Sequence, residues 1–381
     1  MNVLKNSIST RAVGRDVNID FLRGAFILMI ALDHLGWMVK RAMAPTPAHF
    51  PFVTWTHLGW SSAAEFFVFF SGYVIGLVYI RTLNQKGLLL LGARAFHRAW
   101  QLYCFNIITW VISALAVGVL FDADLQILSA TQFDRAQQTN GFDALANFAL
   151  LQDGPAFFDI LQLYMVLLLA TPLLLYICRW NVVALLGVSL ALWGLSQIKP
   201  DWTIYRSGNY WGFNPLSWQL IFCFGLVAAR IKLFDWLKSK AKWALIIGTG
   251  IPLGIIFVLK ALAILGWSGF HEEAFFGILG KQHLGILRIV HFLLSLVFLF
   301  SILPRDGAIE SWWLGRETAR VGRFSLETFC FSTVICYITA ATVLTKLGIH
   351  VAVLAFTGVF VVASIYCFAR FMEFIRSEPW R

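Results

Sequence analysis

The chain has 381 residues, of which 59% are hydrophobic and 13% charged, and its formal net charge is +10. An ordinary soluble domain carries about 25% charged residues, so this composition excludes a water-soluble globule, a disordered chain and a collagen-like fibre. It predicts an integral membrane protein. In such a protein the excess of lysine and arginine indicates first how the chain is oriented in the membrane, rather than nucleic-acid binding.

Ten segments are long and apolar enough to be considered as membrane spans, which take about 20 residues each. The predicted spans are 21–39, 63–80, 98–121, 157–177, 182–198, 216–229, 243–266, 284–303, 321–344 and 349–368. The fold class is therefore an all-α integral membrane protein, a polytopic bundle of about ten transmembrane helices. Residues 1–381 are predicted to form a single domain, with an N-terminal segment (1–20), the bundle (21–370) and a tail (371–381).

The distribution of lysine and arginine predicts the orientation of the bundle. With the N-terminus placed inside, 21 of the 30 basic residues fall on the inner side. The positive-inside rule therefore predicts that both termini are cytoplasmic.

Three titratable residues, Asp33, His34 and Glu65, interrupt the first two spans near their outer ends. Such residues cost at least about 2.5–3.5 kcal/mol inside a span, so they are candidates for function, with a buried structural group as the alternative. All three lie within about 8 Å of the outer boundary at a rise of 1.5 Å per residue. We expect them to share one cavity.

Basic residues favour a second site at the inner side. Arg23 lies on the same helical face as His34, about 16 Å nearer the cytoplasm. Arg94, His97 and Arg98 follow an i, i+3, i+4 pattern at the start of the third span. The guanidinium groups of Arg94 and Arg98 indicate either a positive-inside anchor or a site that binds phosphate oxygens.

Aromatic and cysteine residues allow weaker predictions. The aromatic residues gathered on the outer side favour either an interfacial belt or a platform for sugar rings. The candidates for this platform are Trp55, Trp60, Trp202, Tyr210 and Trp211. The six cysteines have no metal-ligand spacing, so we expect free thiols and no metal site.

Several of these residues carry a resemblance to a known family. Arg23 and His34 are separated by ten residues, which resembles the Arg-x10-His signature of the membrane O-acyltransferases called acyltransferase family 3. Residues 65–73 are similar to the Phe-Phe-x-x-Ser-Gly element of that family. Arg94 and Arg98 resemble its basic pair, although their spacing is one residue wider.

Three segments, 15–34, 61–73 and 322–330, together resemble the OpgC branch, which succinylates osmoregulated periplasmic glucans. The resemblance extends over nearly the whole chain. Many members of the wider family carry a Tyr-x-x-His motif near the ninth span, where this chain has Phe329 to Ser332. This difference removes a second histidine, places more of the chemistry on His34, and favours the OpgC branch.

The resemblance implies a multi-pass enzyme of the bacterial inner membrane with no bound cofactor. Its expected partners are acyl-CoA, with succinyl-CoA as co-substrate, a periplasmic β-glucan as acceptor, and the lipid bilayer, but no nucleic acid. We expect Arg94, Arg98 and Arg23 to bind the phosphates of CoA.

His34 is expected to act as the general base that activates a glucan hydroxyl. Glu65 is the preferred group to orient the imidazole, and Asp33 is second because adjacent helical residues point about 100° apart. Ser71 and Tyr73 are predicted either to donate hydroxyl hydrogen bonds or to pack.

The sequence leaves several alternatives open. A transporter or flippase of an acyl or sugar substrate, and an O-acetyltransferase of another cell-envelope polysaccharide, are the rival functions. The sequence does not determine which acyl group is transferred, or whether transfer is direct or passes through an acyl-enzyme intermediate. It also does not determine the acylated position on the glucan or the oligomeric state, for which a homodimer is one option. Arg206 and Lys260 are candidates to pair with a succinyl carboxylate.

Overall fold

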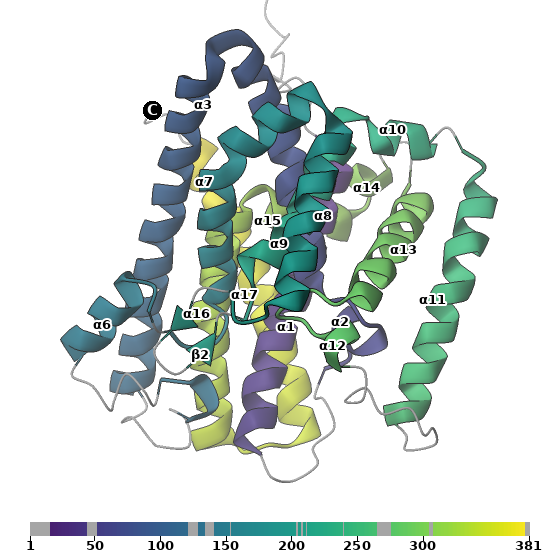
Figure 1. Cartoon of the computed structure of the whole chain (residues 1–381). Coiled ribbons are helices and arrows are strands. Elements are labelled where there is room, and N and C mark those ends of the chain that lie inside the picture. The colour runs from purple at the N-terminus through teal and green to yellow at the C-terminus, as the bar shows by residue number, and fades with distance from the viewer. Residues whose placement is uncertain are drawn as a thin grey trace, which may run out of the picture.

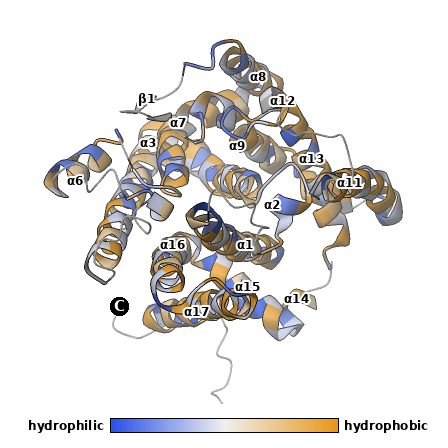
Figure 2. Ribbon diagram, turned by 90° about the horizontal axis from the view of Figure 1, so that it is seen from below, coloured by the Kyte–Doolittle hydropathy of each residue, from blue (hydrophilic) through white to orange (hydrophobic). Residues whose placement is uncertain are grey.

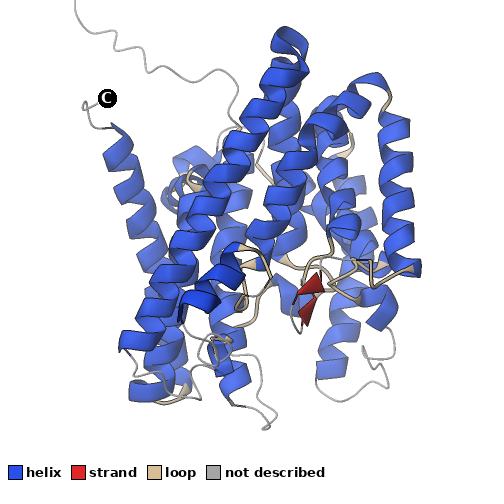
Figure 3. Ribbon diagram, turned by 60° about the vertical axis from the view of Figure 1, so that its left-hand side comes forward, coloured by secondary structure: helices blue, strands red, loops and turns tan. Residues whose placement is uncertain are grey.

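The computed structural model is almost entirely helical (Figure 3). The residues that it describes are 16–43, 52–120, 129–133, 141–152, 154–202, 205–206, 209–210, 212–238, 240–264, 276–304 and 308–377. Within these ranges the only strands are β1 (Tyr205–Arg206) and β2 (Asn209–Tyr210), which pair antiparallel. The predicted all-α class is confirmed for these ranges apart from that hairpin.

Among the described residues, nine long helices form the bundle (Figure 1). They are α1 (Val17–Ala42), α3 (Ala63–Leu120), α7 (Asp159–Trp180), α8 (Val182–Ile198), α9 (Pro215–Arg230), α11 (Lys242–Ile264), α13 (Ile286–Ile302), α16 (Ser325–Thr342) and α17 (Val351–Ser377). The short elements are α2 (Trp55–Leu58), α6 (Gly141–Ala149), α10 (Leu233–Lys238), α12 (Phe276–Leu279), α14 (Ala308–Ser311), α15 (Trp313–Arg323) and the π-helical turn η2 (Val343–Leu347).

Each predicted span falls largely on one helix, and α3 contains two of them. Gly87 has a φ of 80° and bends α3 between its two halves, a conformation that glycine adopts at no steric cost. Six of the described helices are long and apolar enough to cross a membrane, whereas α8, α9 and α13 are apolar but shorter. The chain is thus a membrane protein by helix length and composition, while ten crossings and cytoplasmic termini stay predictions.

Helix α1 lies in the middle of the bundle when viewed along its axis (Figure 2). It packs on α3, α15 and α16, and α3 packs in turn on α7 and α9. Asp16 caps α1 by accepting a hydrogen bond from the Asn18 amide at 2.9 Å. Helix α11 stands at the edge of the bundle and contacts mainly α13 and α2, so most of its apolar surface is left for lipid.

Glycines allow the helix backbones to approach closely at two crossings in the centre of the bundle. A Cβ on Gly24 of α1 would lie 1.9 Å from the Thr318 carbonyl oxygen, and one on Gly322 would lie 1.8 Å from the Asp20 carbonyl oxygen. Gly72 of α3 meets the backbone of α9 in the same way. Small residues let membrane helices approach this closely, so the glycines of all three resemblance segments have a packing role.

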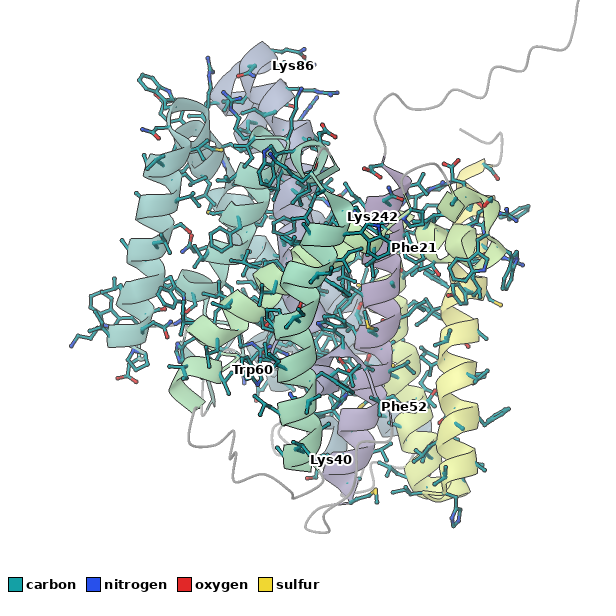
Figure 4. All side chains as sticks on the ribbon, turned by 90° about the vertical axis from the view of Figure 1, so that its right-hand side faces the viewer. Phe21, Lys40, Phe52, Trp60, Lys86 and Lys242 are labelled. Atoms are coloured by element: carbon teal, nitrogen blue, oxygen red, sulfur yellow. The ribbon has the colours of Figure 1, made fainter. Side chains whose placement is uncertain are left out.

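The two ends of the bundle carry different segments (Figure 4). Phe21, Lys86 and Lys242 lie toward one end, while Lys40 and Phe52 lie toward the other. The first group flanks helix ends that were predicted to face the cytoplasm. We call these the inner and outer ends according to that prediction.

Candidate functional site

A cavity of about 560 Å³ lies on the outer half of α1, and we call it the outer cavity. Six ionisable side chains from five parts of the chain line it: Asp33, His34, His57, Asp159, Lys260 and Lys281. Its aromatic lining includes Trp37, Phe157, Phe213 and Phe329. Two of the three predicted titratable residues, Asp33 and His34, therefore share this cavity.

Aromatic rings hold the His34 imidazole. Its ring stacks on Phe157, with centroids 3.7 Å apart and planes 19° apart, and meets Phe329 edge-on at 6.3 Å. Phe157 has a φ of 76°, a rare conformation for a bulky residue that costs about 1–3 kcal/mol and is concentrated at functional sites. Nδ1 of His34 is buried and has no hydrogen-bond partner among the described residues. Packing thus orients this histidine.

The Asp33 carboxylate is occupied by the segment around α2. Its Oδ2 accepts a hydrogen bond from Thr56 Oγ1 at 2.6 Å, and its Oδ1 accepts one from Thr54 Oγ1. His57 Nδ1 lies 3.9 Å from Oδ1. Burial lowers the pKa of His57, although the negative charge of Asp33 opposes that effect. Asp33 therefore anchors a loop over the cavity, and His57 is a lining residue that sequence reasoning missed.

Glu65 does not contact His34 in the part of the chain that the structure describes, contrary to the expected orienting role. Its Oε1 accepts a hydrogen bond from Arg288 Nε at 2.7 Å, and its Oε2 accepts from the amide and the hydroxyl of Ser62 at 2.8 and 2.6 Å. The carboxylate is fully buried. Because each of its oxygens already has a partner, Glu65 ties α3 to α13 behind the cavity.

The predicted aromatic platform is not the lining of the outer cavity. Trp55 and Trp60 instead flank the buried His291 ring, with centroids 6.1 and 6.3 Å away. Trp202 is 55% exposed but does not line that cavity. The Tyr210 side chain and Trp211 lie outside the described residues. The aromatic residues that line this cavity are instead Trp37, Phe157, Phe213 and Phe329, whose positions only the folded chain reveals.

A second cavity, of about 250 Å³, lies on the inner half of α1, and we call it the inner cavity. Its walls are mostly apolar, with polar side chains from four helices: Arg23, Ser71, Arg98, Tyr164 and Ser325. Arg23 Nη2 donates a hydrogen bond to Ser325 Oγ at 2.5 Å. The predicted face of α1 that carries both Arg23 and His34 therefore lines both cavities.

The remaining predicted cations lie beside this cavity. A groove of about 400 Å³ is lined by Arg94, His97 and Arg98 together with Tyr79, and both Tyr79 and Arg98 also line the inner cavity. Arg94 Nη1 donates a hydrogen bond to Thr82 Oγ1 at 2.7 Å. The structure thus brings Arg94 and Arg98 together at the mouth of an apolar cavity.

Phe329 of α16 lines both cavities. Its ring stacks at 6.1 Å on Phe67, which lines the inner cavity, and contacts His34 on the outer side. Of the two predicted hydroxyl donors, Ser71 lines the inner cavity, whereas Tyr73 lines neither and packs on Phe234 at 4.7 Å. Phe329 is therefore a residue that the linings of the two cavities share.

Comparison with known proteins identifies a family. The family model described as OpgC protein matches residues 15–377, nearly the whole chain. Neither a curated protein nor a solved structure matches this chain. The match includes both cavities, the groove and Phe329.

Proposed function

The chain belongs to the OpgC protein family, which implies a membrane acyltransferase that modifies a glucan, and we propose that it transfers a succinyl group from cytoplasmic succinyl-CoA to hydroxyls of osmoregulated periplasmic glucans. The observation that carries this proposal is the pair of cavities that both have Phe329 in their linings. Donor and acceptor lie on opposite sides of the bacterial inner membrane, so such an enzyme needs an approach from each side. Both termini are placed in the cytoplasm in this proposal.

The inner cavity and the groove suit an acyl-CoA. The guanidinium groups of Arg94 and Arg98 would bind the phosphates, because a guanidinium presents several N–H donors in a fixed fork. The pantetheine arm would lie along the apolar walls between Phe67 and Leu168. Arg23 and Ser71 would contact the end of that arm, where polar groups are needed beside the thioester.

His34 would carry the chemistry at the boundary between the two cavities. Its imidazole takes the proton from a glucan hydroxyl while that oxygen attacks the thioester carbonyl carbon. The carbon–sulfur bond then breaks, and the imidazolium returns the proton to the CoA thiolate. Phe157 would hold the ring in place during these steps, since its ring stacks on His34. No bound cofactor or metal ion takes part in this scheme.

The outer cavity would receive one glucose unit of the glucan. Trp37, Phe157 and Phe213 offer aromatic faces for the C–H side of a sugar ring, and Asp159 offers a hydrogen-bond acceptor. Residues from α1, α7 and the segment before α13 line this cavity. A glucan branch would therefore be held across several elements at once.

The test uses the full-length protein purified in detergent, labelled succinyl-CoA and glucan. We expect label in the glucan with no second protein present. If label enters the glucan only when another enzyme is added, the transporter or flippase alternative is correct. Acetyl-CoA is compared with succinyl-CoA as the donor in the same assay. A clear preference for acetyl-CoA would support the O-acetyltransferase alternative.

A further inference from the structure

The loop that carries Lys281 is held rigidly beside the outer cavity. Trp218 Nε1 donates a hydrogen bond to the Lys281 carbonyl oxygen at 3.0 Å, and the Asn214 amide donates one to the Gln282 carbonyl oxygen at 2.9 Å. The Gly285 amide closes the turn onto the Gly280 carbonyl oxygen at 2.9 Å. Because the backbone is fixed on both sides, the side chain of Lys281 leaves the loop from a defined point and lines the cavity.

The other charged groups around this cavity already have oxygen or nitrogen partners. Lys260 Nζ donates hydrogen bonds to the carbonyl oxygens of Thr56 and Gly59 at 3.3 and 2.5 Å. Arg288 is paired with Glu65, and Asp33 with two threonines and His57. These groups hold the walls of the cavity together.

Lys281 is different. No oxygen of the described residues accepts a hydrogen bond from its ammonium group. Nζ lies over the face of the Phe213 ring, 4.8 Å from the ring centroid. Lys281 and His34 line the same cavity. An ammonium has three N–H donors, and the Lys281 side chain is exposed to the space of the cavity. The ammonium is therefore available to bind an anion that enters the cavity.

We propose that Lys281 forms the binding subsite for the distal carboxylate of a dicarboxylic acyl group, and so selects succinyl over neutral acyl groups of the same length. This inference rests on the proposed acyl transfer and deepens it. The carboxylate of a succinyl group lies about 4 Å, three carbon–carbon bonds, from the thioester carbonyl carbon. A donor that presents its thioester to His34 would therefore place this carboxylate in the same cavity. During transfer the carboxylate is unchanged, and only the ester bond forms and the thioester bond breaks.

An acyl carboxylate fits the ammonium better than the neutral acceptor does. A glucose hydroxyl has its own O–H donor and needs no formal charge, whereas a charged hydrogen bond between an ammonium and a carboxylate is about twice as strong as a neutral one. The sequence-based candidates suit this role less well. Lys260 already donates to two carbonyl oxygens, and the Arg206 side chain lies outside the described residues.

The experiment measures donor selectivity in the purified full-length protein with glucan as acceptor. Succinyl-CoA and butyryl-CoA are compared, because butyryl has the same chain length and no carboxylate. Lys281→Met should lower kcat/KM for succinyl-CoA by about 10- to 100-fold, the expected value of one charged hydrogen bond, and leave butyryl transfer unchanged or improved. Lys281→Arg should keep most of the succinyl preference, since it retains the charge. Lys199→Met, on the exposed end of α8, is the matched control and should behave as the wild type.

The outcomes separate this inference from the proposed function. If no variant and no wild-type protein transfers any acyl group, the acyl transfer itself is wrong. If Lys281→Met transfers succinyl with the wild-type preference, or loses succinyl and butyryl transfer by the same factor, the carboxylate subsite is overturned. A loss of preference in Lys281→Arg equal to that in Lys281→Met would also overturn it, because the charge would then not be the cause.

Discussion

The inner and outer cavities share Phe329 in their linings but differ in chemistry. The inner cavity is mostly apolar and carries its guanidinium groups beside the basic groove, whereas six ionisable side chains line the outer cavity. An apolar passage suits a flexible arm that must cross the bilayer core without water. A charged and aromatic chamber suits the reaction and the binding of a sugar. In the proposed function, binding of the donor and the chemical step would be carried by opposite halves of α1.

The largest expected effect comes from His34, the only histidine that contacts Phe329 and Phe157 among the described residues. His34→Ala should lower transfer by about 10²- to 10⁴-fold, because general-base catalysis contributes that much. The measurement is labelled glucan formed by purified protein, and His350→Ala, an exposed position, is the control. A wild-type rate in His34→Ala would remove the outer cavity from the chemistry.

A substitution of Glu65 tests whether every acidic residue near the outer cavity acts in the reaction. Glu65→Ala should lower the free energy of unfolding by about 3–5 kcal/mol, because it leaves the Arg288 charge partly buried without its partner. The control is Glu373→Ala, which removes a more exposed acid from its pairs with Arg320 and Arg323 and should cost about 1 kcal/mol or less. Unchanged thermal stability in detergent with lost transfer would instead return Glu65 to the catalytic step.

The basic groove should affect the donor alone. Arg98→Ala should raise KM for succinyl-CoA by about 10- to 100-fold, because one charged hydrogen bond to phosphate is worth about 1.5–3 kcal/mol. Arg94→Ala should act in the same direction. KM for glucan should stay constant in both variants, and an equal rise for the two substrates would contradict the separation of the cavities.

Phe329 tests the boundary itself. Phe329→Ala should join the two cavities and remove an edge contact of His34, so we expect a roughly 10-fold loss of transfer with a cost of about 3–5 kcal/mol in stability for truncating a buried phenylalanine. We also expect faster release of free CoA when glucan is absent, since water can then reach the thioester. Phe331→Ala is the control on the same helix, because Phe331 stacks on Phe368 at 4.2 Å and lines neither cavity. Equal CoA release in the two variants would show that Phe329 is not a barrier.

The smallest effect concerns pH and the outer cavity. Burial and the nearby Arg288 charge lower the pKa of Lys281, while Glu65, Asp33 and Asp159 oppose that effect. The ammonium should therefore lose its proton at a lower pH than an ordinary lysine, so KM for succinyl-CoA should rise severalfold as pH increases through the alkaline range. KM for butyryl-CoA, and KM for either donor in Lys281→Met, should not follow this rise. Parallel pH profiles for the two donors would assign the change to another group.

The ten predicted spans fall on helices because apolar length is a local property of the chain. The cavity residues were recovered only in part, since pairing between distant segments is not local. His34 was identified from its position in a span, but Glu65 was expected beside it and instead binds Arg288, which is 223 positions away. His57 comes from the short helix α2 and Lys281 from a loop, and no periodic pattern predicts the course of either segment. Trp55 and Trp60 were expected at the acceptor site and instead pack around His291.

The sequence alone determined that this is a helical membrane protein with an Arg23–His34 face on its first long helix and a resemblance to the OpgC family, and it predicted a basic inner side. Those features depend on composition, helical period and short motifs, all of which can be read along one chain. Only the tertiary structure decided that the face lines two cavities, that Phe329 lines both of them, and which charges are paired. Pairing depends on close helix crossings, such as that of Gly24 with α15, and these bring together residues that are hundreds of positions apart.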